Sequence, residues 1–390
     1  MYDILYISNI PLNDKSGYGK LIDMHHQMLE TIFGNRMYSF FFGCNSDDNT
    51  FHNTMSIHSS TPKEKAIANL LGLPPYLNSY GMNQLLKIFR SEKFQYVFID
   101  NSVSGALIPR FKKINPNIKV VCFFHDIEAD LMKKEIQQKR FFRKISLWTM
   151  IQNEKKSVTE NATTIVLNNR DALCFETFYK KKPDAIIPCI IPFPQIKECA
   201  GKHHAHDMLS ITFIGKDYWP NVQGLKWFIK SVIPLLSIKY TFKVIGYGLE
   251  KYQKEFETNN HIQVVGAVDD LSMYYINADV IVAPISDGGG MKVKTAEAFS
   301  FGKIFVGLDE SLMGYWEIIP NSIKNNLIFN VSNEQEFADV LNKLATYEFD
   351  KCNDSIIQWA KANYSQDANV KRLCAIFNSY AGDINENIRK

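Results

Sequence analysis

The stretch DVIVAPISDGGGMKVKTAEAF, residues 279–299, carries the pattern that decides the fold. A continuous apolar run, residues 279–285, is followed by three glycines and then by residues of high helix propensity from about Met291. Continuous apolar runs are typical of parallel strands that are covered on both faces. The order is therefore strand, glycine loop and helix, which is part of a βαβ unit.

The same alternation of apolar runs and helical stretches occurs twice along the 390 residues. It predicts two doubly wound α/β domains, and the length of the chain also favours two domains. We expect strands at 3–8, 38–42, 95–100, 120–126 and 163–169 in the first half, and at 211–215, 242–246, 262–266, 279–285, 303–308 and 327–331 in the second.

These strands set the expected domain limits. We expect an N-terminal domain over 1–190, a linker over 191–208, a C-terminal domain over 209–365, and a helix over 366–390 that packs back on the N-terminal domain. Prolines and a polar end mark residues 187–206 as the linker region. Its histidines could bind a metal, but a solvated linker is favoured; they are His203, His204 and His206.

Composition excludes several classes of protein. A net charge of +3 does not indicate a nucleic-acid partner. The seven cysteines form no C-x-x-C pair, and no signal peptide or spanning segment is evident, so we expect a cytoplasmic protein. The basic and aromatic stretch 133–148 is compatible with peripheral contact at the inner face of a membrane. A solvated helix with one core face is the favoured alternative.

The glycine loop has the composition of a phosphate subsite. Gly288, Gly289 and Gly290 let the backbone come close to a ligand, and the start of the following helix attracts anions. Lys292 and Lys294 would add full positive charges. The alternative is a flexible surface turn beside two solvated lysines. We favour the phosphate subsite, because ligands of open α/β sheets bind beyond the carboxyl ends of the strands.

Glu297 lies one turn into the helix that follows this loop. An i,i+3 ion pair with Lys294 is one interpretation, worth only ~0.5 kcal/mol. The apolar neighbours of Glu297 indicate instead a partly buried carboxylate, which needs hydrogen-bond partners. The two hydroxyls of a ribose could donate hydrogen bonds to this carboxylate.

Other strand ends carry candidate residues. Lys216 follows the first strand of the second half, and His125 follows a central strand of the first half. A lone histidine is more often structural than catalytic. Gly17-x-Gly19 and Gly246-x-Gly248 each lack the third glycine of a dinucleotide fingerprint. No carboxylate-rich D-x-D motif follows a strand, so we expect no metal site and no cofactor.

At this point the second half resembles a known pattern. FIGKDYWPNVQGLKWF (213–228), VIGYG (244–248), VVGAVDDLSMYYINADVIVAPI (264–285) and GGGMKVKTAEAFSFGKIFV (288–306) look like the donor domain of the retaining GT-B glycosyltransferases of family 4, glycosyl transferases group 1. The resemblance covers about 210–308 well and the first domain only loosely. It implies two Rossmann-like domains that face a cleft, with a nucleotide-sugar donor on the second and an acceptor on the first.

The resemblance also implies roles for individual residues. Glu297 matches the ribose-binding glutamate, and Lys216 the basic residue that contacts the diphosphate. The expected catalytic residues are His125, near the transferred sugar, with Lys216, Lys292 and Asp287. The expected donor-binding residues are Gly17, Gly19, Gly215, Gly246, Gly266, Ala267, Val268, Gly288, Gly289, Gly290, Met291, Lys294 and Glu297.

Two positions depart from the family pattern. Gly289 stands where many members carry a second glutamate that holds sugar hydroxyls, and Asp287 is the nearest acid that could substitute. Asn221 stands where many members carry a lysine, and Lys292 could supply the missing cation.

We therefore expect a metal-independent hexosyltransferase that moves a sugar from a nucleoside diphosphate sugar to an acceptor hydroxyl with retention. The role would be in bacterial surface polysaccharide or glycoconjugate synthesis, with a glycan, a lipid-linked or a protein acceptor. A nucleotide-sugar epimerase of the same architecture is one alternative. A non-catalytic subunit that binds a nucleotide sugar is another.

Overall fold

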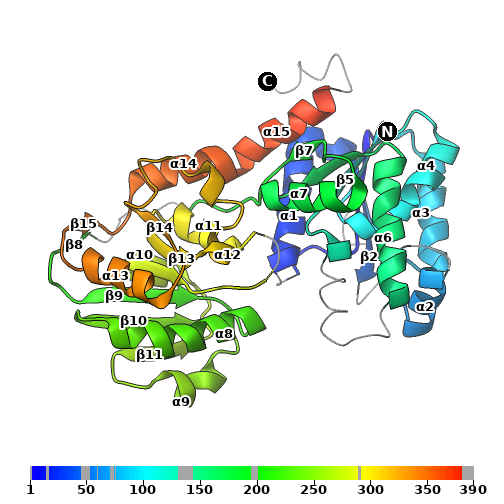
Figure 1. The fold of residues 1–390 in the computed structure, drawn as a ribbon. Helices are drawn as coiled ribbons and strands as arrows, with labels where there is room; N and C mark the ends of the chain where they lie inside the picture. The colour runs from blue at the N-terminus through cyan, green and yellow to red at the C-terminus, as the bar shows by residue number, and fades with distance from the viewer. Residues whose placement is uncertain are drawn as a thin grey trace. The chain divides into compact units, whose positions relative to one another are not determined.

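The computed structural model describes residues 2–14, 17–44, 53–58, 60–70, 74, 76–130, 144–194, 201–288 and 291–379. The chain divides into two compact units (Figure 1). Unit 1 comprises Met1–Ile190 with Asn369–Lys390, and unit 2 comprises Ile191–Ala368. The chain passes from unit 2 back to unit 1 within its last described helix.

Unit 1 is built on a seven-stranded sheet in the order β3-β2-β1-β4-β5-β6-β7, and every neighbouring pair is parallel. Its strands are β1 (Ile4–Ser8), β2 (Met37–Cys44), β3 (Thr54–His58), β4 (Tyr96–Ile99), β5 (Lys119–Phe124), β6 (Thr163–Val166) and β7 (Ala185–Ile186). Its helices are α1 (Gly17–Phe33), η1 (Gly34–Arg36), α2 (Pro62–Leu70), α3 (Ser79–Ser91), η2 (Ser102–Leu107), α4 (Ile108–Ile114), α6 (Lys144–Thr159) and α7 (Asn169–Tyr179).

Unit 2 has a six-stranded parallel sheet in the order β11-β10-β9-β12-β13-β14. Its strands are β9 (Leu209–Ile214), β10 (Tyr240–Ile245), β11 (Ile262–Gly266), β12 (Val280–Ala283), β13 (Ile304–Leu308) and β14 (Ile328–Val331), with β8 (Lys202–His203) paired to β15 (Phe349–Asp350). Its helices are α8 (Trp219–Trp227), η4 (Phe228–Val232), η5 (Ile233–Leu235), η6 (Glu250–Tyr252), α9 (Gln253–Phe256), α10 (Ser272–Asn277), α11 (Val293–Ser300), α12 (Asp309–Leu312), η7 (Trp316–Ile318), α13 (Glu334–Leu344), α14 (Asp354–Tyr364) and the start of α15 (Gln366–Asn378).

Both sheets have the doubly wound order in which the first strand lies beside the second and the fourth. The predicted parallel α/β architecture and the expected strands are confirmed, because the continuous apolar runs are buried on both faces. The sequence did not indicate β3 and β7. β3 is only partly buried, and β7 has two residues, so neither carries a long apolar run.

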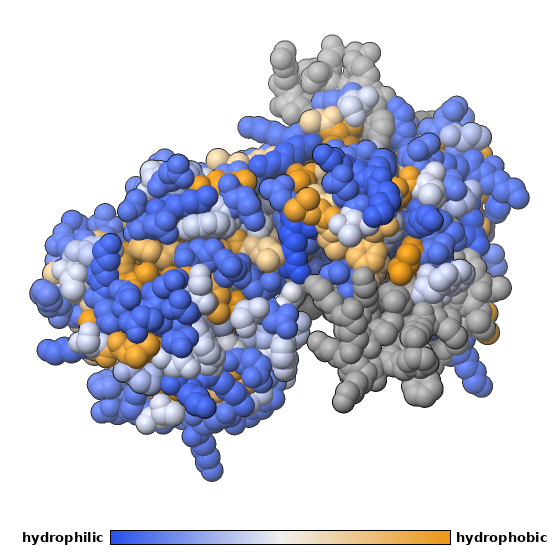
Figure 2. Space-filling view, in the orientation of Figure 1, coloured by the Kyte–Doolittle hydropathy of each residue, from blue (hydrophilic) through white to orange (hydrophobic). Residues whose placement is uncertain are grey.

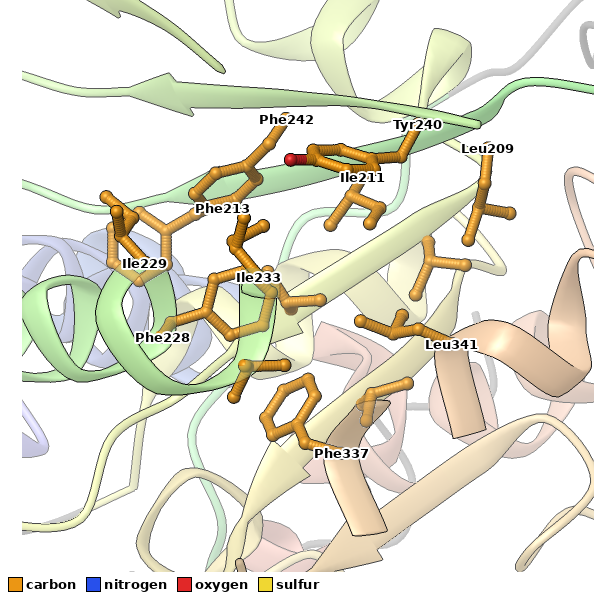
Figure 3. Packing of buried hydrophobic residues seen from close by; sticks show 14 of the residues in the cluster. Leu209, Ile211, Phe213, Phe228, Ile229, Ile233, Tyr240, Phe242, Phe337 and Leu341 are labelled. Carbon is orange, nitrogen blue, oxygen red and sulfur yellow. The ribbon is translucent and has the colours of Figure 1, made fainter. Parts of the chain in front are cut away.

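The core of unit 2 is formed where helices cover the sheet. Figure 3 shows Phe228 beside Phe242 of β10 and beside Phe337 of α13. The ring centroid of Phe228 lies 5.0 Å from that of Phe242 and 5.2 Å from that of Phe337. The apolar side chains are thus mainly inside, and the face of unit 2 seen in Figure 2 is largely hydrophilic.

The predicted linker is wrong in part. His203 is buried in β8, stacks on Phe349 at 4.7 Å, and its Nδ1 lies 3.2 Å from a carboxylate oxygen of Asp279. His204 is exposed and pairs with Glu348. The histidines therefore fasten this segment to unit 2, and residues 195–200 lie outside the described residues.

The last helix, α15, contributes its end to unit 1. Phe377 packs against Phe33 and Tyr96, with ring centroids 5.1 Å apart in both cases. Residues 380–390 of the predicted terminal helix lie outside the described residues, as do residues 133–143 of the basic stretch. No described helix combines the length and apolar character that crossing a membrane requires.

Lys303, directly before β13, is fully buried. Its Nζ donates hydrogen bonds to the carbonyl oxygens of Ile276, Ala278 and Lys351 at 3.0, 2.9 and 2.5 Å. The ammonium thereby joins the end of α10 to the segment before α14.

We expect Lys303→Met to lower the free energy of unfolding by about 2–4 kcal/mol, because three buried carbonyls lose their donor. Urea unfolding followed by tryptophan fluorescence measures it, since four of the five tryptophans lie in unit 2. The exposed Lys343→Met is the matched control. Equal stability of the two variants would contradict a structural role for Lys303.

Candidate active site

The carboxyl ends of β9 and β12 meet at the switch point of the unit 2 sheet. The loop after β9 carries Gly215 and the exposed Lys216. Gly246, after β10, has a φ of +143°, and a Cβ there would stand 1.8 Å from the carbonyl oxygen of Gly215. Only glycine allows these two loop backbones to touch, so Gly246 sets the shape of this edge.

Lys294, in the first turn of α11, contributes a half-buried ammonium to the same edge. Its Nζ donates a hydrogen bond to Oδ1 of Asn221, whose Nδ2 donates to the carbonyl oxygen of Lys216 at 2.8 Å. The ammonium also lies 4.9 Å from the ring centroid of Phe213. Burial, with the nearby charge of Lys292, lowers the pKa of Lys294 to about 7, against a smaller opposing effect of Glu297.

Lys292 has a different environment from Lys294. Its Nζ lies 2.6 Å from Oε1 of Glu310, and both side chains are 12% exposed. Its carbonyl oxygen accepts a hydrogen bond from the hydroxyl of Tyr315 at 3.0 Å. The cation nearest Asn221 is therefore Lys294, whereas the sequence indicated Lys292 as the substitute for a lysine at that position.

Glu297 lies one turn further along α11 and is half-buried. Its Oε2 accepts a hydrogen bond of 3.3 Å from the hydroxyl of Tyr275. Burial, and then Glu297 itself, raises the pKa of Tyr275 well above its usual value, so this hydroxyl keeps its proton. Tyr275 stacks on Phe301 at 4.6 Å, which fixes the donor.

The remaining predicted donor residues lie around this edge. Asp287 is exposed, and its Oδ1 accepts a hydrogen bond from the backbone N–H of Gly288 at 2.7 Å. Gly266 accepts one from the N–H of Gly246 at 2.7 Å. Ala267 is exposed, Val268 is half-buried and Met291 is buried, while Gly289 and Gly290 lie outside the described residues. The roles given to these residues stay predictions.

In unit 1 the carboxyl edge of the sheet carries a buried polar network. Asp100 follows β4, and its carboxylate lies 2.7 Å from Nε2 of His125 and 2.9 Å from Nδ1 of His25. The hydroxyl of Tyr6 donates to the same carboxylate at 2.6 Å. Burial alone would raise the pKa of Asp100, but His25 and His125 together hold it well below its usual value.

A pocket of about 180 Å³ adjoins this network. Asn9, Asn101 and His125 are among its lining residues, after β1, β4 and β5 respectively. The buried Glu154 of α6 accepts the backbone N–H groups of Glu128 and Ala129 at 3.2 and 3.1 Å, and so holds the segment after His125.

Gly17 and Gly19, which were expected to bind the donor, lie in the first turn of α1, and that role stays a prediction. A Cβ on Gly19 would stand 2.3 Å from the carbonyl oxygen of Asp14, so close packing accounts for this glycine.

Sequence reasoning missed His25, Asp100 and Tyr275. Asp100 carried a signal, because a carboxylate ended a predicted buried strand. His25 and Tyr275 lie within helices and gave none.

Three comparisons bear on the architecture. Residues 209–346, about a third of the chain, match the family model of glycosyl transferases group 1. The chain is similar to the crystal structure of Anabaena Alr3699/HepE in complex with UDP and glucose, with a TM-score of 0.66, 11% identity and coverage of 97% of this chain and 100% of that one. It is also similar to the crystal structure of a glycosyltransferase from Rickettsia africae, with a TM-score of 0.62, 13% identity and coverage of 99% of each chain. A third similar structure is the N-terminal domain of Candida albicans trehalose-6-phosphate phosphatase, with a TM-score of 0.61, 9% identity and coverage of 97% of each chain.

The fold is GT-B. The similar structures share this fold. The match to glycosyl transferases group 1 covers residues 209–346, in the unit that holds Lys294 and Glu297. No curated protein matches the sequence.

Lys292, which precedes α11, and Lys294, in its first turn, should have opposite effects on stability. The unfolded chain keeps its lysine proton up to about pH 10, while folded Lys294 loses it near pH 7, so folding is penalised most at pH 7 and below. We expect Lys294→Met to raise Tm at pH 6–7, and the gain to shrink as the pH rises toward 10.

Lys292→Met is the matched control and should lower Tm, because the ion-pair partner of the mostly buried Glu310 is removed. Differential scanning calorimetry between pH 6 and 10 separates the two effects. A loss of stability in Lys294→Met at pH 6–7 would contradict the burial of a charge there.

Proposed function

We propose that this protein is a glycosyltransferase that transfers a hexose from a nucleoside diphosphate sugar to an acceptor hydroxyl. The observation that carries the proposal is the half-buried ammonium of Lys294 at the switch point, held beside the loop of Lys216 by Asn221. An ammonium kept partly out of water interacts strongly with an anion, and a diphosphate leaving group is such an anion.

The remaining donor contacts follow from the same edge of the sheet. Lys216 is exposed, its backbone is linked to Lys294 through Asn221, and it would contact the diphosphate together with the start of α11. Glu297 would accept the ribose hydroxyls, as the resemblance of this segment to the donor domain implies, and the hydroxyl of Tyr275 hydrogen-bonds to the same carboxylate. Lys292 would approach the diphosphate by exchanging Glu310 for it.

We further propose that the transfer proceeds without metal, because the lysines supply the positive charge, and with retention, as the resemblance of the donor domain implies. His125 would lie near the transferred sugar, and Asp287 would take the place of the sugar-binding glutamate. The setting would be the cytoplasm and the synthesis of a bacterial surface polysaccharide or glycoconjugate. The acceptor is a glycan, a lipid-linked molecule or a protein.

The structure of HepE in complex with UDP-glucose supports UDP sugars as the first donors to examine. A thermal-shift screen with UDP-glucose, UDP-N-acetylglucosamine and GDP-mannose tests binding. A ligand at a hundred times its Kd adds ~2.7 kcal/mol of stability.

Incubation with the selected donor alone then separates the three candidate functions. Slow release of nucleoside diphosphate supports the transferase. An epimerised donor would establish the epimerase, and binding without any turnover after addition of glycan acceptors would establish a non-catalytic subunit.

The pH dependence of UDP binding tests the role of Lys294. A bound diphosphate should raise the pKa of Lys294 from about 7, so binding takes up a proton above pH 7. We expect the Kd of UDP, measured by calorimetry, to increase between pH 7.5 and 9 by up to about tenfold per pH unit.

Lys294→Met should bind UDP more weakly at pH 7 and lose this pH dependence. Lys303, whose pKa burial also lowers to about 7, is present in both proteins and cannot account for a difference. A Kd that does not change with pH in the unmodified protein would contradict the binding of the diphosphate by Lys294.

A further inference from the structure

Asp100 receives three hydrogen bonds in the interior of unit 1. The donors come from three parts of the chain: Tyr6 of β1, His25 of α1 and His125 after β5. Tyr6, His25 and Asp100 are fully buried, and His125 is 4% exposed. An ionised carboxylate only accepts hydrogen bonds, so each of the two imidazoles must present an N–H to it.

This requirement fixes the tautomer of His125. Its Nε2 carries the hydrogen that faces Asp100, and its Nδ1 has no partner among the described residues. A protonated ring would bury an Nδ1–H without an acceptor, which is costly. The neutral ring with Nδ1 as an acceptor avoids that cost. The ring of Tyr18, with its centroid 4.4 Å away, packs against the imidazole and limits its rotation.

The pocket beside His125 presents further unpartnered polar atoms. Both amide atoms of Asn101, which is 2% exposed, and Oδ1 of Asn9 have no partner among the described residues. Buried polar groups are rarely left unpaired, so these atoms indicate a ligand with hydroxyl groups, which both donate and accept.

The charge and size of the pocket restrict the ligand. Its described lining residues include Asp126 and Glu128 and no lysine or arginine, which disfavours a phosphate. Its volume of about 180 Å³ lies below the roughly 300–1,000 Å³ of pockets for drug-sized ligands, which suits one sugar ring better than a nucleotide.

His25, Asp100 and His125 also form a candidate metal cluster, because their ligand atoms lie within 4.8 Å of one another. The geometry favours hydrogen bonds instead. Ligands of a tetrahedral zinc stand about 3.3 Å apart, as follows from zinc–nitrogen distances of about 2.0–2.1 Å. Here the carboxylate of Asp100 lies only 2.7 and 2.9 Å from the two ring nitrogens.

We infer that Asp100, with His25 as its second buried partner, is a positioning residue that holds His125 with Nδ1 as an acceptor for a neutral sugar hydroxyl in this pocket. The inference rests on the proposed function for the identity of the sugar, which is that of the donor or of the acceptor. The positioning itself depends only on unit 1.

Nitrogen-15 NMR of the full chain labelled in histidine tests the positioning directly. In the unmodified protein, His125 should show a protonated Nε2 and an unprotonated Nδ1, assigned by comparison with His125→Gln. A protonated Nδ1, or a doubly protonated ring at pH 7.5, would overturn the inference. So would stoichiometric binding of added zinc that shifts both ring signals.

Asp100→Asn should mix the tautomers of His125, because the carboxamide offers one acceptor oxygen to three donors and its own N–H needs an acceptor. Tyr6→Phe is the matched control: it removes the third donor from the same carboxylate and should leave the tautomer unchanged. A tautomer of His125 that stays the same in Asp100→Asn would also overturn the inference.

Turnover of UDP-glucose separates positioning from a purely structural role of Asp100, because loss of structure would weaken kcat/KM and the binding of UDP alike. Asp100→Asn should lower kcat/KM by about 10- to 100-fold, the cost of one unmet hydrogen bond to the ligand, while the Kd of UDP changes less than about twofold. Equal losses in both would indicate general damage to the fold and contradict a positioning role. If no donor is turned over, the proposed function fails, and the NMR result still decides the positioning of His125.

Discussion

The carboxamide of Asn221 joins the two segments on which the candidate donor site depends. It accepts a hydrogen bond from the ammonium of Lys294 and donates one to the carbonyl oxygen of Lys216. These segments follow β12 and β9, which are neighbours at the switch point of the sheet. Because of this link, the backbone of the loop after β9 is held beside the ammonium at the start of α11.

The two units differ in the charge they present. The edge of unit 2 gathers lysines and the start of a helix, which suits an anion. The pocket of unit 1 is lined by amides, an imidazole and carboxylates, which suits hydroxyl groups. Each unit thus offers groups for a different part of the proposed donor: unit 2 for its diphosphate, and unit 1 for the hydroxyl groups of a sugar.

The fold could be predicted from the sequence because its strands are continuous apolar runs. Short or half-buried strands such as β3 and β7 gave no such signal. Residues at strand ends, such as Lys216 and His125, were also found, because the topology dictates where strand ends lie.

Side-chain pairing could not be predicted in the same way. Lys292 and Lys294 are two residues apart and look equivalent in the sequence, yet one pairs with Glu310 and the other with Asn221. The partners of Asp100 are likewise 94, 75 and 25 residues away along the chain. Only the packed fold brings such groups together.

Hydrogen exchange of the full chain with and without UDP tests the central claim most directly. The account predicts slower exchange in peptides that cover 213–221, 244–249 and 291–299, and no change around 100–103 and 124–128, since UDP lacks the sugar. Slower exchange confined to the unit 1 segments, with none at the start of α11, would contradict it.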